Sequence, residues 1–360
     1  MVPVLTADRL TVAELAAHFH PVPGYLAAAS SGVAADLTLA ALRADQEAWS
    51  QGRRGPADYD QVVSRTRRLY AELVGVPDSW VAIGSTTSAL VANLAAGLPA
   101  GAEVLVPEEE FTSIVYPFLA SGQLQVRSAP LNQLAAAIGP QTAVVAFSVV
   151  QSATGELADL AAIREAAGRV GALTLADLTQ AAGLLPVAAT GFDLTVCHAY
   201  KWLCAPRGVA FLTVRPDLIE RLTPVSAGWY AGDDPWASCY GTDFAPARTA
   251  RRFDTSPAWQ AFAGAEAALS LFVRADLEEV WRHCSGLGDR LCRGLGLEPR
   301  HQAIVSWPDP EGCQLAALTA AGIQASGRAG RVRVAFAVWN TTADVDAVLA
   351  AVGRPADIAR

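Results

Sequence analysis

Short apolar runs alternate with longer helical patterns through the middle of the chain. Apolar runs of strand length lie at residues 80–83, 103–106, 124–128, 142–150, 173–176, 194–197 and 208–214. Residues 60–74 and 157–169 instead space their apolar side chains as a helix does. Strands that alternate with helices over residues 75–215 predict a mostly parallel sheet with helices on both of its faces.

The last third of the chain has a different pattern. Residues 226–250 are rich in Gly, Asp, Pro, Trp and Tyr and predict a long loop. Two long helices follow, and after them a smaller α+β unit, with strands at 303–306 and 331–337 and helices at 312–321 and 342–352. We therefore expect a large domain over residues 15–255 and a small domain made of residues 1–14 and 256–360.

Polar or aromatic side chains follow the ends of several predicted strands. These are the hydroxyl-rich segment 85–87, Phe111, the pair Gln151 and Ser152, Asp177, and Lys201. In open α/β sheets, ligands bind beyond the carboxyl ends of the strands. The shared placement of these residues predicts one ligand site at that edge of the sheet.

Two of these segments have more than one interpretation. Thr86 and Thr87 lie between a strand and a helix, where hydroxyls and backbone N–H groups bind phosphate well. Ser and Thr also cap helices without any ligand, and both interpretations stay open. Phe111 can lie on a flat ring or pack into the core.

Asp177 and Lys201 together suggest a specific cofactor. A lysine amine forms a Schiff base with the aldehyde of pyridoxal 5′-phosphate (PLP). A carboxylate pairs with the pyridinium nitrogen and keeps it protonated, so that the ring acts as an electron sink. Either residue alone is unremarkable, but together with the phosphate and stacking candidates they predict a PLP site.

Composition excludes several other classes of protein. Hydrophobic residues make up 52% of the 360, enough for a sizeable core. The net charge is −8 with scattered basic residues, which argues against a nucleic-acid partner. We see no secretory signal and no uninterrupted apolar stretch of membrane-spanning length. The six cysteines lack metal-like spacing, so we expect no metal and a cytoplasmic protein with free thiols.

The sequence resembles the class V aminotransferase group of PLP enzymes, which includes cysteine desulfurases, isopenicillin-epimerase-like proteins and kynureninases. The resemblance runs from residue 25 to about 352. It is carried by Asp177-x-x-Gln180, the lysine after His198-x-Tyr200, Thr255-Ser256-Pro257, and the segment from Arg333 to Thr341. It implies PLP fold type I: a large domain with a seven-stranded-type, mostly parallel sheet between helices, and a small α+β domain.

The resemblance also implies roles for the cofactor-binding residues. Lys201 forms the Schiff base and later moves the α-proton as acid and base. Asp177 pairs with the ring nitrogen, and Gln180 donates to the phenolic oxygen. Thr86, Thr87, His198 and Tyr200 hold the phosphate. Phe111 takes the place of a stacking histidine, and Ser152 or Gln151 stands where the family often has asparagine.

Further residues are assigned to the substrate and to a second subunit. Arg333 matches the arginine that grips the substrate α-carboxylate, a bidentate task suited to guanidinium. Ser30 and Arg54 are expected near the substrate. Ser256 matches a residue that reaches the phosphate of the neighbouring subunit, which implies a homodimer with shared active sites.

The implied function is that of an enzyme acting on an L-amino acid through an external aldimine and Cα deprotonation. Desulfurases carry a mobile cysteine loop before the carboxylate arginine, whereas residues 323–333 are short and lack cysteine. Cys313 lies earlier, on a predicted helix. We therefore favour β-elimination by a C–S lyase without a persulfide cysteine. Amino transfer to a 2-oxo acid and epimerisation remain alternatives, and a non-catalytic scaffold is disfavoured because Lys201, Asp177 and Arg333 are all present.

Overall fold

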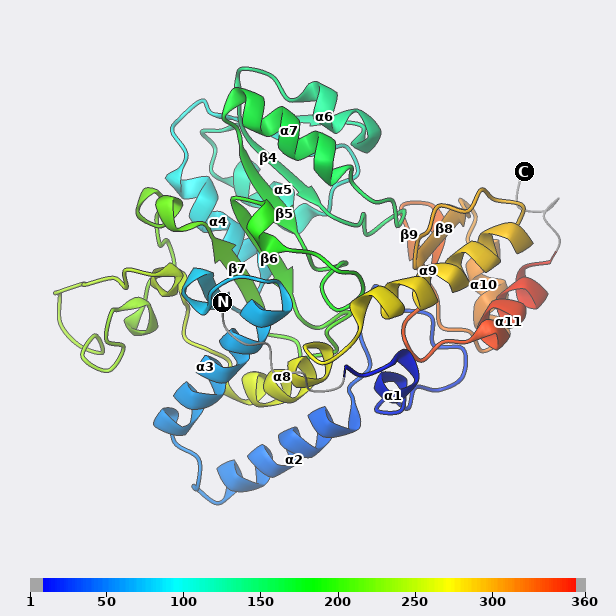
Figure 1. Cartoon of the computed structure of the whole chain (residues 1–360), viewed down its shortest axis with the longest axis horizontal. Helices are drawn as coiled ribbons and strands as arrows, with labels where there is room; N and C mark the ends of the chain where they lie inside the picture. Colours follow the sequence, from blue (N-terminus) through cyan, green and yellow to red (C-terminus); the bar gives the residue numbers. More distant parts are fainter. Residues whose placement is uncertain (1–8, 354–360) are drawn as a thin grey trace.

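A seven-stranded sheet forms the centre of the larger part of the computed structural model, which describes residues 9–353 (Figure 1). The strand order is β1-β7-β6-β5-β4-β2-β3. The strands are β1 (Val81–Gly84), β2 (Glu103–Pro107), β3 (Gln125–Ala129), β4 (Thr142–Ser148), β5 (Leu173–Asp177), β6 (Leu194–His198) and β7 (Ala210–Val214). Strands β3, β2, β4, β5 and β6 run parallel, and β7 runs antiparallel to β6 and β1. The prediction of a mostly parallel sheet is confirmed.

Helices cover both faces of this sheet. On one face, α4 (Thr87–Gly97) and α5 (Thr112–Ala120) share an apolar core with the strands. On the other face lie α3 (Pro56–Leu73), α7 (Leu160–Val170) and α8 (Trp259–Phe272). The helices α1 (Val12–Ala16), α2 (Asp36–Ser50) and α6 (Leu134–Ala137) complete this part of the chain.

The apolar runs of the sequence follow from burial on two sides. Successive side chains of a strand point to opposite faces, so a strand covered on both faces needs apolar residues at every position. In β7, Phe211 packs into the core of α3 and α8, whereas Ala210 and Leu212 pack into that of α4 and α5. This double burial fixes the strands and therefore the position of their carboxyl ends.

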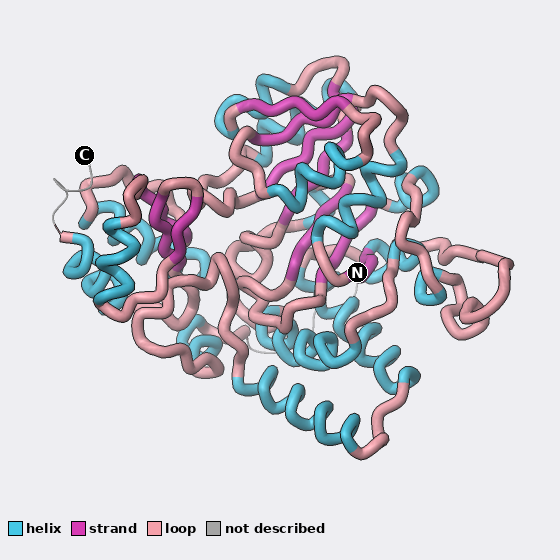
Figure 2. The backbone as a smooth tube through the Cα atoms, turned by 180° about the vertical axis from the view of Figure 1, so that it is seen from behind, coloured by secondary structure: helices cyan, strands magenta, loops and turns pink. Residues whose placement is uncertain are grey.

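The smaller part is built on a three-stranded antiparallel sheet, β8-β10-β9, which lies apart from the large sheet (Figure 2). Its strands are β8 (Ile304–Pro308), β9 (Ser326–Arg328) and β10 (Arg331–Ala335). Its helices are α9 (Leu277–Gly294), α10 (Cys313–Ala320) and α11 (Thr342–Val352). Leu26 also joins this core, so an early segment of the chain links the two parts.

The chain passes from the core of the large sheet to that of the small sheet later than residue 256, where the domain boundary was expected. The α8 side chains Phe262 and Leu269 belong to the core of the large sheet. Helix α9 contributes Val280 to that core and Leu291 to the small one. The change of core therefore occurs along α9. Val12 also packs into the large core, and residues 1–8 lie outside the described residues.

Three local elements differ from the sequence-based expectation. Helix α3 begins earlier, at Pro56, because proline suits the first helical position and the Asp58 carboxylate accepts from the Gly55 N–H. Helix α5 was not predicted, since it contains Pro117. Strand β9 was also missed, because three residues give no detectable periodicity.

The segment between β7 and α8 is the expected long loop. It projects from the body as the yellow-green trace of Figure 1, and its Tyr240 is 96% exposed. No helix within residues 9–353 has the length and apolar character needed to cross a membrane.

Candidate active site

The carboxyl ends of the central strands open into a pocket of about 180 Å³. Neighbouring strands end level with one another, because Ser148 of β4 pairs in register with Asp177 of β5. Nine residues expected at the site from the sequence line this pocket: Thr86, Thr87, Phe111, Ser152, Asp177, Gln180, His198, Tyr200 and Lys201. Residues far apart in the chain are therefore brought together at the predicted edge of the sheet.

Lys201 lies in the loop after β6 and is 5% exposed. Its Nζ atom lies 5.3 Å from the ring centroid of Phe111 and 5.8 Å from that of Tyr200. Burial lowers the pKa of Lys201 to about 8, and the charges of Arg333 and Arg328 act in the same direction, against Asp177. A substantial fraction of Lys201 is therefore in its neutral, nucleophilic form near neutral pH. The sequence contains no other lysine, a signal that by itself singles out this residue.

Asp177 ends β5 and is also 5% exposed. Its Oδ1 accepts from the Thr179 N–H at 2.8 Å. Burial raises the pKa of Asp177 to about 6; the Glu110 charge raises it further, and that of Lys201 opposes the shift. A cation held against this carboxylate would favour its ionised form, since opposite charges lower a carboxyl pKa by about 1–3 units.

The hydroxyl end of the pocket lies at the start of α4. Thr86 caps this helix by accepting from the Ala89 N–H at 3.4 Å, so the capping interpretation holds. Thr86, Thr87 and Ser88 nevertheless line the pocket as well. Nearby, the Nε2 of His198 is buried with no hydrogen-bond partner among the described residues. Burial lowers the pKa of His198 to about 4, which keeps this ring neutral.

Arg207 also lines this end and was not expected from the sequence. Its guanidinium lies 4.9 Å from the ring centroid of Tyr200. A cation beside helix-terminal hydroxyls favours an anionic ligand. The one feature of the sequence that could have indicated a role for Arg207 is its position six residues after Lys201.

Arg333, on β10, approaches the pocket from the small domain. It is 1% exposed, and its Nη1 donates to the carbonyl oxygen and the hydroxyl of Ser152, which lines the pocket. Its Nη2 donates to Ser30 Oγ at 2.7 Å. Arg333 and Ser30, two of the three residues predicted to bind substrate, are therefore in contact.

The turn that carries Ser30 is fixed against the lysine loop. The Gly32 N–H donates to the Tyr200 carbonyl at 2.8 Å. A Cβ atom at Gly32 would lie 2.0 Å from the Lys201 carbonyl oxygen, so only glycine allows this close approach. The N-terminal segment thus forms one wall near Lys201.

Gln180 and Gln151 differ in what they contact. The Nε2 of Gln180 donates to Ala29 O at 3.0 Å and to Ser152 Oγ at 3.2 Å. Gln151 instead donates to the Glu110 carboxylate at 2.8 Å and does not line the pocket. Of the two alternatives at this position, Ser152 is the one that faces the cavity.

Arg333 and Ser30 do not line this pocket themselves but contact each other beside it, and Arg333 also contacts Ser152. Arg54 and Ser256 do not line the pocket either. Arg54 is paired with Asp45, with Nε 2.7 Å from Oδ1, and its guanidinium lies 4.8 Å from the Tyr59 ring centroid. Ser256 is exposed and follows Asp254, whose buried carboxylate is held by Arg67 at 2.6 Å. The role of Arg54 near the substrate and that of Ser256 at a subunit interface stay predictions.

Glu110 is a buried acid that the sequence did not single out. Its carboxylate accepts from the N–H groups of Phe111 and Ser148, both at 2.7 Å, and from the side chains of Ser148 and Gln151. It thereby joins the end of β2 to the end of β4 and fixes the backbone of Phe111. Its position directly before Phe111 was the only sequence signal.

Glu110→Gln is expected to lower the free energy of unfolding by about 1–3 kcal/mol. The two backbone N–H groups bind different carboxylate oxygens, so one of them must face the new amide group. Denaturant unfolding would measure the loss. Glu109→Gln is the matched control, because Glu109 is exposed. A loss no greater than that of the control would contradict the assigned role.

The lowered pKa of Lys201 gives a pH prediction. Only the neutral amine reacts with an acylating reagent, so labelling of the cofactor-free protein should be half-maximal near pH 8 and level off above it. In the denatured chain the midpoint should rise to about 10.4. Peptide mass spectrometry of the single lysine would follow both curves. Coincident curves would show that the fold does not change the pKa of Lys201.

The segment before Arg333 is a tight hairpin. Arg328 of β9 pairs with Arg331 of β10, and the two intervening residues, Ala329 and Gly330, both have positive φ. Cys313, the only cysteine on the preceding helix, is exposed at the start of α10. No cysteine lines the pocket within the described part of the chain.

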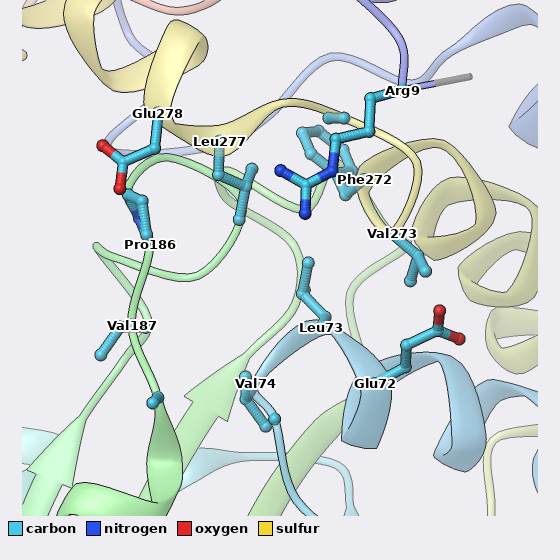
Figure 3. Close-up of a pocket in the computed structure, with 13 residues that line it drawn as sticks. Arg9, Glu72, Leu73, Val74, Pro186, Val187, Phe272, Val273, Leu277 and Glu278 are labelled. Atoms are coloured by element: carbon cyan, nitrogen blue, oxygen red, sulfur yellow. The ribbon is translucent and has the colours of Figure 1, made fainter. Parts of the chain in front are cut away.

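A larger cavity of about 580 Å³ lies elsewhere, between the end of α3 and the start of α9 (Figure 3). Arg9 projects into it, and Glu72 and Glu278 lie at its edges. It lacks the combination of amine, buried carboxylate and helix-terminal hydroxyls that the smaller pocket offers. We therefore assign the chemistry to the pocket around Lys201.

The chain matches the family model described as aminotransferase class-V over residues 47–328. The uncharacterized aminotransferase YcbU of Bacillus subtilis (strain 168) is 29% identical over 229 residues, 60% of this chain and 60% of that protein. Kynureninase of Deinococcus radiodurans is 30% identical over 256 residues, 68% of this chain and 62% of the enzyme. The chain thus aligns with less than two thirds of the length of these relatives.

The solved complex of the cystine C-S lyase C-DES with its reaction product cysteine persulfide shares the fold. Its TM-score is 0.81 at 22% identity, over 91% of this chain and 96% of that one. The match to the family model covers most of the chain and contains Asp177 and Lys201. The chain therefore belongs to the class V aminotransferase family.

Proposed function

We propose that the protein is a PLP-dependent enzyme that cleaves a carbon–sulfur bond at Cβ of an L-amino acid by β-elimination. One observation carries the proposal. The only lysine of the chain and a strand-end carboxylate line the same buried pocket, between helix-terminal hydroxyls and a buried arginine.

The residues of the pocket fit PLP. Lys201 offers an amine to an aldehyde and Asp177 a carboxylate to a ring nitrogen. Donors to a phosphate are offered by Thr86, Thr87 and Arg207. The buried Nε2 of His198, which has no hydrogen-bond partner among the described residues, could form a hydrogen bond with the bound cofactor. When bound, PLP supplies an electron sink for negative charge that develops at the substrate Cα.

Lys201 and Arg333 divide the handling of the substrate. Arg333 and Ser30 orient the substrate α-carboxylate, and this fixes the direction of the Cα–H bond. When it is not bonded to the cofactor, Lys201 Nζ would remove the α-proton as a general base. A pKa of about 8 suits this proton transfer near neutral pH.

Phe111 determines what kind of group can leave. Its ring is 45% exposed, lies beside Lys201, and offers no proton to a departing atom. A thiolate leaves without prior protonation far more easily than an alkoxide, because a thiol has a pKa of about 8.5. The Cα–H bond would break with its proton passing to Lys201, a Cα=Cβ bond would form, and the Cβ–S bond would break so that sulfur departs with its substituent as a thiolate. The thiolate then takes a proton from water to give the thiol. No enzyme cysteine is needed to receive it.

The proposal includes a homodimer with shared active sites. Ser256 is exposed and does not line the pocket of its own chain, which suits a contact with the phosphate bound by a second copy. The buried ion pair between Arg67 and Asp254 holds the backbone that leads to Ser256.

The product analysis tests the reaction. Incubation of the PLP-loaded enzyme with S-substituted L-cysteines should give pyruvate, ammonia and thiol in equal amounts, with no 2-oxo acid added as a co-substrate. The similarity to YcbU supports amino transfer as the second candidate. Products that appear only when a 2-oxo acid is added, without release of thiol, would identify an aminotransferase and contradict the lyase.

A further inference from the structure

Two guanidinium groups meet at one hydroxyl near the pocket. Arg333 Nη2 donates to Ser30 Oγ at 2.7 Å, and Arg328 Nη2 donates to the same oxygen at 3.2 Å. Two like charges therefore lie within roughly 6 Å of each other, a separation at which they repel. Neither arginine forms an ion pair with a carboxylate among residues 9–353. This arrangement is suited to anions.

The two arginines differ in depth. Arg333 is almost fully buried, whereas Arg328 is exposed at the end of β9. The charge of Arg328 nevertheless reaches inward, since it contributes to the lowered pKa of both Lys201 and Arg333. Arg328 therefore lies at the mouth of the site and Arg333 inside it.

The tight hairpin fixes Arg328 relative to Arg333. Arg333 pairs with Ser326 and Arg331 with Arg328, across a turn of two residues. Ser326 Oγ also accepts from Arg333 Nε at 3.1 Å. The Arg328 backbone is thus held in register with the Arg333 backbone, so the two cations act at a defined spacing.

The donors of Arg333 are largely engaged by the protein. Nε donates to Ser326, Nη1 to Ser152, and Nη2 to Ser30. Arg333 is therefore rigidly oriented, with its charge available to one carboxylate. Among the described residues, the acceptors of Arg328 are its neighbour Gly327 O, at 2.7 Å, and Ser30. It retains N–H groups for a second anion.

The charges at the pocket also indicate that Arg328 can bind a second anion. If PLP binds as proposed, its phosphate is matched by Arg207 and the substrate α-carboxylate by Arg333. Asp177 is the only carboxylate among the described residues that line the pocket, and it is assigned to the ring nitrogen. The charge of Arg328 is left without a counterpart.

We propose that Arg328 selects substrates that carry a second carboxylate on the side chain, bound at the mouth of the site while Arg333 holds the α-carboxylate. This inference rests on the proposed function. It narrows the substrate class to cysteine S-conjugates whose sulfur substituent ends in a carboxylate. Arg328 is then a specificity residue that contacts the substrate but takes no part in proton transfer.

The test compares ligands that differ only in charge. S-carboxymethyl-L-cysteine and its carboxamide, S-carboxamidomethyl-L-cysteine, have nearly the same shape. Dissociation constants for the PLP-loaded enzyme would be measured before turnover, from the rapid change in cofactor absorption after mixing with increasing ligand concentrations. The carboxylate should bind about tenfold or more tightly than the carboxamide.

Variants then assign the preference to one residue. Arg328→Gln should reduce the preference to about twofold or less, with carboxamide binding nearly unchanged. Arg328→Lys keeps the charge and should retain part of the preference. Arg331→Gln is the matched control, because Arg331 lies on the same hairpin but donates to Ser306 at 2.9 Å. It should keep the full preference.

Three results would overturn the inference. Equal binding of both ligands by the unmodified enzyme would show that the enzyme does not distinguish the side-chain carboxylate from the neutral carboxamide. Equal weakening of both ligands in Arg328→Gln would place Arg328 on the shared α-carboxylate. The same loss of preference in Arg331→Gln would show a general charge effect. If instead no amino acid changes the cofactor absorption, the proposed function itself fails.

Discussion

Lys201→Ala is expected to abolish the yellow absorption near ~420 nm that a protonated PLP Schiff base gives. Turnover should fall by at least about 10³-fold, because the attachment point and the general base are lost together. No other lysine exists in the chain to replace it. Absorption spectra and initial rates of the purified protein after PLP addition would measure both effects.

Lys201→Arg is the matched control for charge. Arginine keeps the cation in the pocket, but a guanidinium stays protonated and cannot serve as nucleophile or base. This variant should lose the band and the activity as completely as the alanine variant. Substantial activity in either variant, with an unchanged melting temperature, would show that Lys201 does not perform the chemistry.

Asp177→Asn is expected to lower turnover by at least about a hundredfold, the scale seen when one electrostatic partner of a reacting group is removed. The amide keeps an oxygen that can accept from Thr179, but it cannot hold a proton on the ring nitrogen. The cofactor band should persist with a shifted maximum, since Lys201 is intact. Rates and spectra from one preparation would separate the two effects.

Asp193→Asn is the control for this variant. The Asp193 carboxylate also accepts from a backbone N–H, that of Thr174 at 2.8 Å, but at the opposite end of β5. The substitution removes the same charge away from the pocket, where Asp193 is paired with Arg215, and the amide keeps an oxygen that can accept from Thr174. Equal effects of the two substitutions on turnover would mean that Asp177 acts only through stability.

The sequence could predict which residues lie together at the pocket, because their placement depends on the sheet. Once the apolar runs define parallel strands, residues that follow strand ends must share one edge. Asp177 and Lys201 were identified in this way, and the pocket contains both. Predicting Arg333 and Ser30 required the family resemblance, because Arg333 lies on β10 of the small sheet and Ser30 on the N-terminal segment, and neither follows a strand end of the large sheet.

The missed residues depend on contacts between distant segments. The environment of Glu110 is made by Ser148 and Gln151 of another strand, and that of Arg328 by Ser30 near the N-terminus. Nothing in the local pattern of either residue reveals such a partner. The domain to which helix α8 belongs also could not be predicted from its own sequence. Its apolar pattern predicts a helix with a buried face, but only the folded structure shows that this face packs into the core of the large sheet.

The most direct test of the account is borohydride reduction of the PLP-loaded protein, followed by peptide mass spectrometry. Reduction makes a lysine–PLP bond permanent, and the chain has one lysine to carry it. We predict one phosphopyridoxyl group per chain, on the peptide that contains Lys201. Bound PLP that leaves Lys201 unmodified after reduction, or a label found only on the N-terminal amine, would contradict the account.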